Sequence, residues 1–265
     1  MGILSWRGSK SLDAALSSYA KENLFSLFDS CVIVLPDPDE TIRKVAQKYP
    51  LVIHELPENI GIAGGMKAVA NALDTDYVLF LENDCPLVEN FAEAQRQIQL
   101  SINALQSNAA LMARLRSRRL PGEHFTTLEK YRRYWDESVF ANLRKNLRPA
   151  KAKRLSGSAI YAGSNPVKKH PDNIQFYKQD TTSTSYLVEA EVMPWTNQSI
   201  LIRRKTFLET IMPYVESRPL RRAINGFHNV EIELNQSKFW VNSNFRIFCP
   251  SGLFTHQRLE HRGYV

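Results

Sequence analysis

The sequence has few cysteines and no long apolar run, and these shortages exclude several classes of protein. Only three cysteines occur among 265 residues, and they show no metal-ligand spacing. This length excludes a disulfide-stapled miniprotein, and the odd count of cysteines favours a reducing compartment. No stretch approaches the ~20 apolar residues that would span a bilayer, and the N-terminal apolar run is too short for a signal peptide. We therefore expect a cytoplasmic protein.

Familiar nucleotide-binding motifs, internal repeats and low-complexity tracts are also missing. Neither the dinucleotide fingerprint G-x-G-x-x-G nor the P-loop pattern occurs. Hydrophobic residues make up 43% of the chain and charged residues 23%, which are ordinary values for soluble globular proteins. Wholesale disorder is therefore excluded, and a packed domain of enzyme size is expected.

Basic residues exceed acidic ones. The chain has 34 Lys or Arg and 27 Asp or Glu, a net charge of +7, which favours anionic partners. Residues 114–154 hold thirteen of the basic residues and only four acidic ones. Three interpretations of this segment stay open: a solvated face, a surface attracted to the anionic cytoplasmic face of a membrane, or a phosphate-binding surface for nucleic acid.

Short β-rich runs alternate with helical patterns over the first ninety residues, which is typical of βαβ units and a largely parallel sheet. The predicted strands of the chain are 3–5, 31–35, 51–53, 77–81, 110–115, 199–202 and 245–249. The clearest predicted helices are 11–20, 39–48, 89–105, 205–214 and 229–239, with another ending at Leu73. Residues 155–184 carry little periodicity and predict loops or an insertion.

Polar residues follow three of the predicted strands. They are Ser5 to Arg7, Asp37, and Glu82-Asn83-Asp84. Ligands of open α/β sheets bind beyond the carboxyl ends of the strands, so these residues are candidate ligand groups. The acids of the third cluster suit Mg²⁺ or Mn²⁺ held together with substrate phosphates. Such residues also commonly end strands, so this cluster alone leaves a purely structural role open.

The turn from Glu58 to Gly65 opens a helix. Its glycines let the backbone approach a ligand, its helix N-terminus favours anions, and Lys67 lies one turn further on. A helix-opening turn that simply needs flexible glycines explains the same pattern.

In this order, the motifs resemble those of nucleotide-sugar glycosyltransferases of the GT-A fold, especially the large inverting family of bacterial polysaccharide and lipopolysaccharide enzymes. The resemblance is carried by Ser5-Trp6-Arg7, Asp37, Glu58-Asn59-Ile60-Gly61, Glu82-Asn83-Asp84 and Gly252-Leu253-Phe254-Thr255-His256. It is good over residues 2–90, patchy over 186–256 and absent over 114–184.

The resemblance implies an α/β fold with a Rossmann-like, mostly parallel central sheet flanked by helices. One domain is expected over 1–265, with a nucleotide-sugar-binding half (1–105) and an acceptor-side half (106–265) that contains a basic, loop-rich insertion (114–184). It also implies transfer of a sugar from a nucleoside-diphosphate sugar to a hydroxyl of a glycan or lipid-linked acceptor, with inversion and with Mn²⁺ or Mg²⁺. The implied donor-binding residues are Ser5, Trp6, Asp37, Asn59, Gly61, Lys67, Glu82 and Asn83, and the implied metal ligands are Asp84 and His256.

The family register implies Glu231 as the base that deprotonates the acceptor. On a helix Glu233 would point about 200° away from Glu231, so only one of the two carboxylates can face the site. Trp195 is a candidate platform for the acceptor sugar, with core packing as an equal alternative. The chain departs from the family pattern at three places: Glu82 replaces Asp, Lys67 replaces Asn, and His228-Asn229 replaces a Glu-Asp pair.

Two other functions stay open. A sugar nucleotidyltransferase would have a Gly-rich basic loop after the first strand, which Ser5 to Lys10 imitates only faintly. A non-enzymatic basic protein that binds nucleic acid is the second alternative. No nucleic-acid-binding motif occurs, so nucleic acid is not an expected partner.

Overall fold

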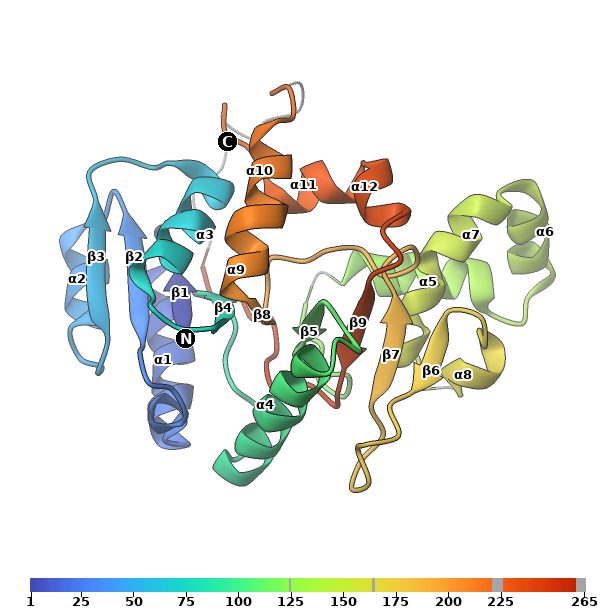
Figure 1. Ribbon diagram of the computed structural model, residues 1–265, viewed down its shortest axis with the longest axis horizontal. Coiled ribbons are helices and arrows are strands. Elements are labelled where there is room, and N and C mark those ends of the chain that lie inside the picture. The colour runs from blue at the N-terminus through green and yellow to red at the C-terminus, as the bar shows by residue number, and fades with distance from the viewer. Residues whose placement is uncertain (124, 164, 221–225, 261–265) are drawn as a thin grey trace.

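In the computed structural model, nine strands form one sheet, and helices cover it (Figure 1). The structure describes residues 1–123, 125–163, 165–220 and 226–260. The strands are β1 (Gly2–Leu4), β2 (Val32–Pro36), β3 (Val52–Leu56), β4 (Tyr77–Glu82), β5 (Met112–Arg114), β6 (Ile174–Phe176), β7 (Tyr186–Glu189), β8 (Ile200–Arg203) and β9 (Arg246–Cys249). Their order across the sheet is β3-β2-β1-β4-β8-β5-β9-β7-β6.

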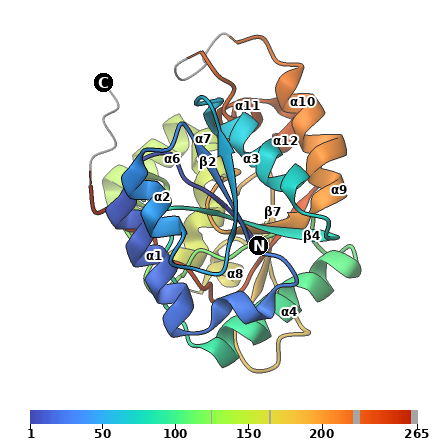
Figure 2. The same ribbon diagram turned by 90° about the vertical axis from the view of Figure 1, so that its left-hand side faces the viewer.

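Helices lie on both faces of the sheet (Figure 2). They are α1 (Ser9–Lys21), α2 (Glu40–Ala46), α3 (Gly61–Ala72), α4 (Phe91–Gln106), α5 (Thr126–Trp135), α6 (Val139–Leu147), α7 (Pro149–Leu155), α8 (Pro166–Lys169), α9 (Arg204–Thr206), α10 (Met212–Glu216), α11 (Val230–Asn235) and α12 (Lys238–Val241). Shorter helical turns are η1 (Leu24–Leu27), η2 (Ser156–Tyr161) and the π-helical turn η3 (Phe207–Ile211). In the described part of the chain, no helix combines the length and the apolar character needed to span a bilayer.

Alternation along the central strands produces two cores. In β2, Val32 and Val34 face one core, whereas Ile33 and Leu35 face the other, because successive side chains of a strand point to opposite faces. Helices α1, α2 and α4 cover the second core, and α3, α10, α11 and α12 cover the first. Two apolar faces explain why the central strands are almost continuously hydrophobic.

The sequence predictions for the first half of the fold are confirmed. Strands β1 to β4 are parallel neighbours, as the βαβ rhythm predicts. Asp39 caps α2 by accepting a hydrogen bond from the backbone N of Ile42 at 2.9 Å. Gly61 begins α3 with a φ of 71°, and a Cβ there would lie 2.3 Å from the Cβ of Phe227. This turn therefore requires glycine.

The prediction of loops over 155–184 is wrong in part. The segment contains η2, α8 and β6, and β6 pairs antiparallel with β7 at the edge of the sheet. Strand β6 has three residues and buries only Ile174, so it lacks an alternating pattern. The predicted helix 229–239 is also interrupted, because Ser237 caps a new helix by accepting a hydrogen bond from the backbone N of Trp240 at 3.4 Å.

Candidate active site

The carboxyl ends of β1, β2, β4 and β5 open onto the same edge of the sheet. Leu4 pairs with Val34 on one side and with Glu82 on the other. The first residue of antiparallel β8, Ile200, lies between Phe80 of β4 and Arg114 of β5. The polar residues that follow these strands are therefore neighbours, as strand-end ligand groups of an α/β sheet must be.

Asn83 and Ser5 are almost completely buried at this edge. Asn83 donates a hydrogen bond from Nδ2 to the backbone O of Arg7 at 2.6 Å, which holds the turn after β1 against the end of β4. Ser5 is 1% exposed, and its Oγ has no hydrogen-bond partner among the described residues. Because an unsatisfied buried hydroxyl costs free energy, this atom is a candidate contact for a bound ligand.

Asp84 meets the C-terminal segment of the chain. Its Oδ2 lies 3.1 Å from Nε2 of His256 and 3.3 Å from Nη2 of Arg258. The backbone N of Gln257 also donates to the backbone O of Asp84 at 2.8 Å. Residues remote in sequence are thereby fixed side by side, with the Asp84 carboxylate fully buried between them.

The His256 ring is oriented by its other nitrogen. Nδ1 lies 3.2 Å from the backbone O of Glu123, so a proton on Nδ1 turns Nε2 toward Asp84. Burial lowers the pKa of His256, but the hydrogen bond with Asp84, the negative charge of Asp84 and the hydrogen bond with the Glu123 backbone together outweigh burial, and the net pKa is raised.

A carboxylate beside an oriented imidazole is a donor set that suits Mn²⁺. Among the described residues, no group of three or more His, Cys, Asp or Glu side chains could hold a metal. Asp84 and His256 supply two ligand groups, so a cation held there would need further ligands, such as substrate phosphates, to complete its shell.

Glu231 has a strongly shifted pKa. It lies in the first turn of α11, which Asn229 caps by accepting a hydrogen bond from the backbone N of Glu231 at 2.9 Å. Burial and then the negative charge of Glu82 raise the pKa of Glu231 to about 7, against the opposing effect of Arg114 and Arg116. The side chain keeps solvent access while the surrounding protein removes part of its hydration. A carboxylate with this pKa can accept a proton near neutral pH.

Glu233, the alternative base, is engaged elsewhere. It is buried, its Oε1 lies 3.5 Å from Nδ1 of His228, and its Oε2 lies 3.8 Å from Nε of Arg218. The two glutamates have different partners, as the helical spacing predicts.

The other predicted donor residues lie in different surroundings. Asn59 Oδ1 accepts a hydrogen bond from the backbone N of Gly61 at 2.9 Å. This turn lies beside the segment leading into α11, because the backbone N of Ala63 donates to the backbone O of His228 at 3.3 Å. Asp37 is exposed at the end of β2 with a φ of 47°.

Three further predicted positions have assigned partners. Glu82 Oε2 accepts a hydrogen bond from Nε2 of Gln198 at 3.3 Å, and the Trp6 ring lies 4.8 Å from the Arg7 guanidinium. Lys67 Nζ lies 2.6 Å from Oε1 of Glu216 on α10, so its charge is already paired.

The hypothesis that Trp195 forms a sugar platform is wrong. The Trp195 side chain is 1% exposed and packs edge-on against Trp240, with ring centroids 5.4 Å apart. Its indole Nε1 donates to Oδ1 of Asn197 at 3.1 Å. Core packing, the equal alternative, describes this residue.

Sequence reasoning missed Arg114, Arg116 and Arg258. The first two belong to the basic segment 114–154, yet both are buried and both act on the pKa of Glu231. Arg114 and Arg116 alternate with Ala113 and Leu115, which is the pattern of a strand with one polar and one apolar face. This pattern distinguishes them from the exposed cations of α5 to α7.

Comparison with known proteins supplies the fold class. No family model and no curated protein matches the chain. The structure of Staphylococcus aureus TarS, residues 1–349, is similar over 97% of this chain with a TM-score of 0.51 and 11% identity. A second TarS structure, in complex with UDP-GlcNAc, has a TM-score of 0.49 and 12% identity over the full chain. The chain spans about 60% of the length of these TarS structures.

A further similar structure is glucosyl-3-phosphoglycerate synthase from Mycobacterium tuberculosis, in complex with Mn²⁺, UDP and glucosyl-3-phosphoglycerate. The two structures match over 98% of this chain and 72% of the synthase chain, with a TM-score of 0.47 and 9% identity. The likeness to TarS confirms the expected fold, an α/β fold of the GT-A type.

Proposed function

We propose that this chain is a glycosyltransferase that moves a sugar from a nucleoside-diphosphate sugar to a hydroxyl acceptor, with inversion at the anomeric carbon. The observation that carries the proposal is the convergence at one sheet edge of the orphaned Ser5 hydroxyl, the Asp84-His256 pair and the Glu231 carboxylate with its pKa near 7. These groups are the parts that such a transfer needs: donor contacts, a place for the diphosphate and a base.

Different residues would bind the cation, position the donor and accept the proton. Asp84 and His256 would hold a divalent cation, which, when bound, neutralises the departing diphosphate. Ser5 and Asn83 position the donor at the ends of β1 and β4. Glu231 accepts the proton of the acceptor hydroxyl as that oxygen attacks the sugar, and its raised pKa keeps it basic enough to do so at neutral pH.

Donor binding can be tested without knowing the sugar. Thermal unfolding is measured with UDP, GDP and their sugar conjugates, with and without Mn²⁺, because a ligand that binds only the folded state raises the unfolding temperature. We expect one nucleoside diphosphate to stabilise the protein, and more strongly with Mn²⁺. No stabilisation by any member of the panel would contradict the proposal.

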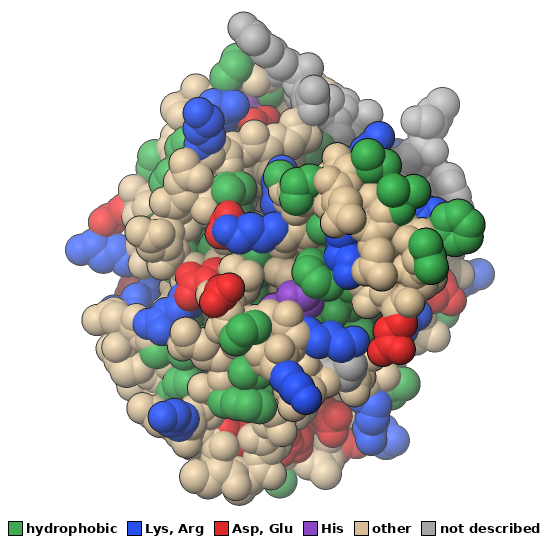
Figure 3. Space-filling view, turned by 90° about the vertical axis from the view of Figure 1, so that its right-hand side faces the viewer, with side chains coloured by type: hydrophobic (Ala, Val, Ile, Leu, Met, Phe, Trp, Pro, Cys, Tyr) green, Lys and Arg blue, Asp and Glu red, His purple; other side chains and the backbone are tan. Residues whose placement is uncertain are grey.

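We also propose that the enzyme works at an anionic bilayer, where a lipid-linked acceptor would lie. Helix α6 supports this, because it exposes an apolar stripe at helical spacing: Val139 (81% exposed), Phe140 (71%), Leu143 (54%) and Leu147 (71%). Exposed basic side chains accompany the stripe on α5 to α7. On the face of the molecule that carries these helices, hydrophobic and basic side chains are interleaved (Figure 3). This combination matches an interface of anionic headgroups and acyl chains.

Vesicle sedimentation tests this part of the proposal. We expect the protein to bind phosphatidylglycerol-containing vesicles and not vesicles of phosphatidylcholine alone. Replacing Phe140 and Leu147 together by Glu should lower binding at least ~10-fold, because two apolar anchors are lost and two repelling charges gained. The control is Val52→Glu, an exposed valine at the opposite edge of the sheet. Equal binding by all three proteins would contradict membrane docking by α6.

A further inference from the structure

A cavity of about 430 Å³ opens among α5, α6, α7 and α8. These helices lie on the face of the molecule that Figure 3 shows. Among the described residues that line the cavity, none belongs to the candidate active site. Sites for small ligands commonly have volumes of about 300–1,000 Å³. The cavity is therefore large enough for a small organic ligand and is separate from the site described above.

The lining of this cavity is positively charged. Three lysines from three different helices line it: Lys145 of α6, Lys153 of α7 and Lys169 of α8. Lys153 Nζ lies 2.8 Å from Oε1 of Glu191, so its charge is paired. Among the described residues, no Asp or Glu oxygen lies within 4.0 Å of Nζ of Lys145 or Lys169. Asp172 is the one carboxylate among the described residues of the lining, so the cavity favours an anion.

Trp135 gives the cavity an aromatic wall. Nζ of Lys145 lies 5.0 Å from the centroid of the Trp135 ring, and the His170 ring packs edge-on against the same indole with centroids 4.4 Å apart. The indole Nε1 donates to the backbone O of Ala152 at 3.0 Å, which fixes the orientation of the ring. An apolar surface beside cations suits an organic anion better than a bare inorganic ion.

His170 is the buried member of the lining. It is 5% exposed, and its Nε2 lies 3.3 Å from Oη of Tyr131. Burial, and then the charges of Lys169 and Lys145, lower the pKa of His170 to about 4. The imidazole is therefore neutral near pH 7, and the positive charge of the cavity comes from the lysines.

The cavity borders the apolar stripe of α6. Asn146 and Pro149 line the cavity, and Leu147 of the stripe lies between them in the sequence. An amphipathic helix on a membrane lies at the boundary between head groups and acyl chains. A bilayer that holds the stripe would therefore present lipid head groups to the cavity. Lysines match the phosphate of such a head group, and the indole matches its glycerol part.

We propose that this cavity binds the phosphate head group of an anionic lipid, with Lys145 and Lys169 contacting the phosphate and Trp135 lying against the glycerol part. This inference rests on the proposed docking at an anionic bilayer, and it adds selectivity for the head group to the apolar contact of α6. A head group held beside the inserted stripe would fix the orientation of the enzyme on the membrane.

Calorimetric titration with short-chain lipids below their micelle concentrations tests the site in solution. We expect dihexanoyl phosphatidylglycerol to bind the wild-type protein at least ~10-fold more tightly than dihexanoyl phosphatidylcholine, because the lysines repel the choline cation. We also expect it to bind more tightly than inorganic phosphate. No binding of the phosphatidylglycerol, or equal binding of the phosphatidylcholine, would overturn the proposal. Equal affinity for inorganic phosphate would assign the cavity to free phosphate and overturn the lipid assignment.

Variants identify the residues that bind the lipid. Lys145→Gln and Lys169→Gln together should weaken the binding of dihexanoyl phosphatidylglycerol at least ~10-fold, because two charged contacts with the phosphate are lost. The matched control combines Lys130→Gln and Lys168→Gln, which remove two exposed charges of α5 and α8 outside the lining. The control should bind the lipid like the wild type. Unchanged affinity in the first variant, or an equal loss in the control, would overturn the assignment.

Vesicle sedimentation separates this proposal from the docking of α6. If the wild type sediments with phosphatidylglycerol vesicles but the variant at positions 145 and 169 binds the soluble lipid normally, the cavity assignment is wrong and the docking stands. If binding of the soluble lipid depends on the two lysines but the wild type does not sediment, the docking of α6 is wrong and the cavity still binds the head group.

Discussion

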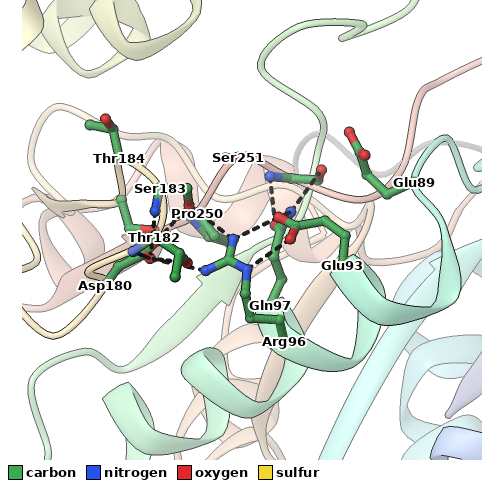
Figure 4. A network of polar contacts seen from close by, with 12 residues as sticks. Glu89, Glu93, Arg96, Gln97, Asp180, Thr182, Ser183, Thr184, Pro250 and Ser251 are labelled. Atoms are coloured by element: carbon green, nitrogen blue, oxygen red, sulfur yellow. Dashed lines mark hydrogen bonds and ion pairs between the residues drawn. The ribbon is translucent and has the colours of Figure 1, made fainter.

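Two buried aspartates, Asp180 and Asp84, have opposite surroundings. Asp180 lies in the loop between β6 and β7, with a side chain that is 0% exposed. It accepts hydrogen bonds from Nη1 of Arg96 at 2.9 Å and from the backbone N and Oγ of Ser183 at 3.0 and 2.7 Å. Figure 4 shows Arg96 of α4 reaching this loop and joining it to Glu93. Burial alone would raise the pKa of Asp180, but the hydrogen bonds from Ser185 and Ser183 lower it to about 2.

Asp84 is equally buried but belongs to an edge that is chemically incomplete. Asp84 itself is paired with His256 and Arg258, but the same sheet edge holds a Ser5 hydroxyl and an Arg114 Nε that have no hydrogen-bond partner among the described residues. This edge also lies near Glu231, whose pKa is raised to about 7 in part by the charge of Glu82. A network in which every group is satisfied stabilises a structure, whereas unsatisfied buried groups and perturbed pKa values gather at functional sites. The comparison thus distinguishes a structural network, around Asp180, from a candidate functional site, around Asp84, by whether the neighbouring polar atoms have hydrogen-bond partners.

The largest expected effect concerns Glu231. Glu231→Gln should lower the turnover of sugar transfer by ~10²-fold or more, the usual contribution of a general base, while nucleoside diphosphate affinity stays unchanged. Glu233→Gln is the matched control, because it removes a carboxylate that pairs with His228 and Arg218. If turnover falls in Glu233→Gln and not in Glu231→Gln, Glu233 is the base and the assignment of Glu231 is contradicted.

The pH dependence of transfer gives the next effect. Because the base must be ionised and the pKa of Glu231 is about 7, kcat/KM should rise about tenfold per pH unit below pH 7 and level off above it. Burial makes the largest contribution to this midpoint, the charge of Glu82 raises it further, and the charges of Arg114 and Arg116 oppose the rise. A midpoint near the ordinary carboxyl value of 4.5 would contradict the assignment of Glu231.

Substitution of Asp180 should affect the stability of the protein and not its activity. Asp180→Asn should lower the free energy of unfolding by about 2–3 kcal/mol at pH 7, as expected for lost hydrogen bonds to a buried charge, with nucleotide affinity unchanged. Since the pKa of Asp180 is lowered on folding, its stabilisation is present above the unfolded pKa near 3.8 and is lost as pH falls toward 2. Chemical denaturation at pH 7 and pH 3 measures both effects. Equal loss of nucleotide binding would place Asp180 in the site after all.

The smallest effect is a gain in stability. The pKa of Glu231 is raised on folding, so this carboxyl favours the folded state at low pH and disfavours it once ionised above pH 7. Glu231→Gln should therefore unfold at a slightly higher temperature than the wild type at pH 8, with little difference at pH 4. Destabilisation at pH 8 would indicate a structural role for this carboxylate.

The sequence predicts the first half of the fold well because that half is built from local patterns. Apolar runs such as 31–35 lie between turn residues and amphipathic helices, and each becomes a parallel strand. The place of Ser5, Asn83 and Asp84 at the carboxyl ends of the strands follows from the same topology. The contact of His256 with Asp84 came from the family resemblance and not from any local pattern.

The second half escapes prediction for two physical reasons. Strand β6 and helix α8 are too short to show a period, and their stability comes from neighbours distant in sequence. Charge counting, in turn, does not distinguish a buried cation from an exposed one. Arg116 and the cations of α6 contribute equally to the count, yet one lies over Phe125 and the others lie at the surface.

Calorimetric titration of nucleoside diphosphates in the presence of Mn²⁺ tests the central claim most directly, on three proteins: wild type, Asp84→Ala and Asp180→Asn. We expect the wild type and Asp180→Asn to bind the same diphosphate with equal affinity, whereas Asp84→Ala should lose the Mn²⁺-dependent part of the binding. Equal affinity in all three proteins, or no binding by the wild type, would contradict this claim.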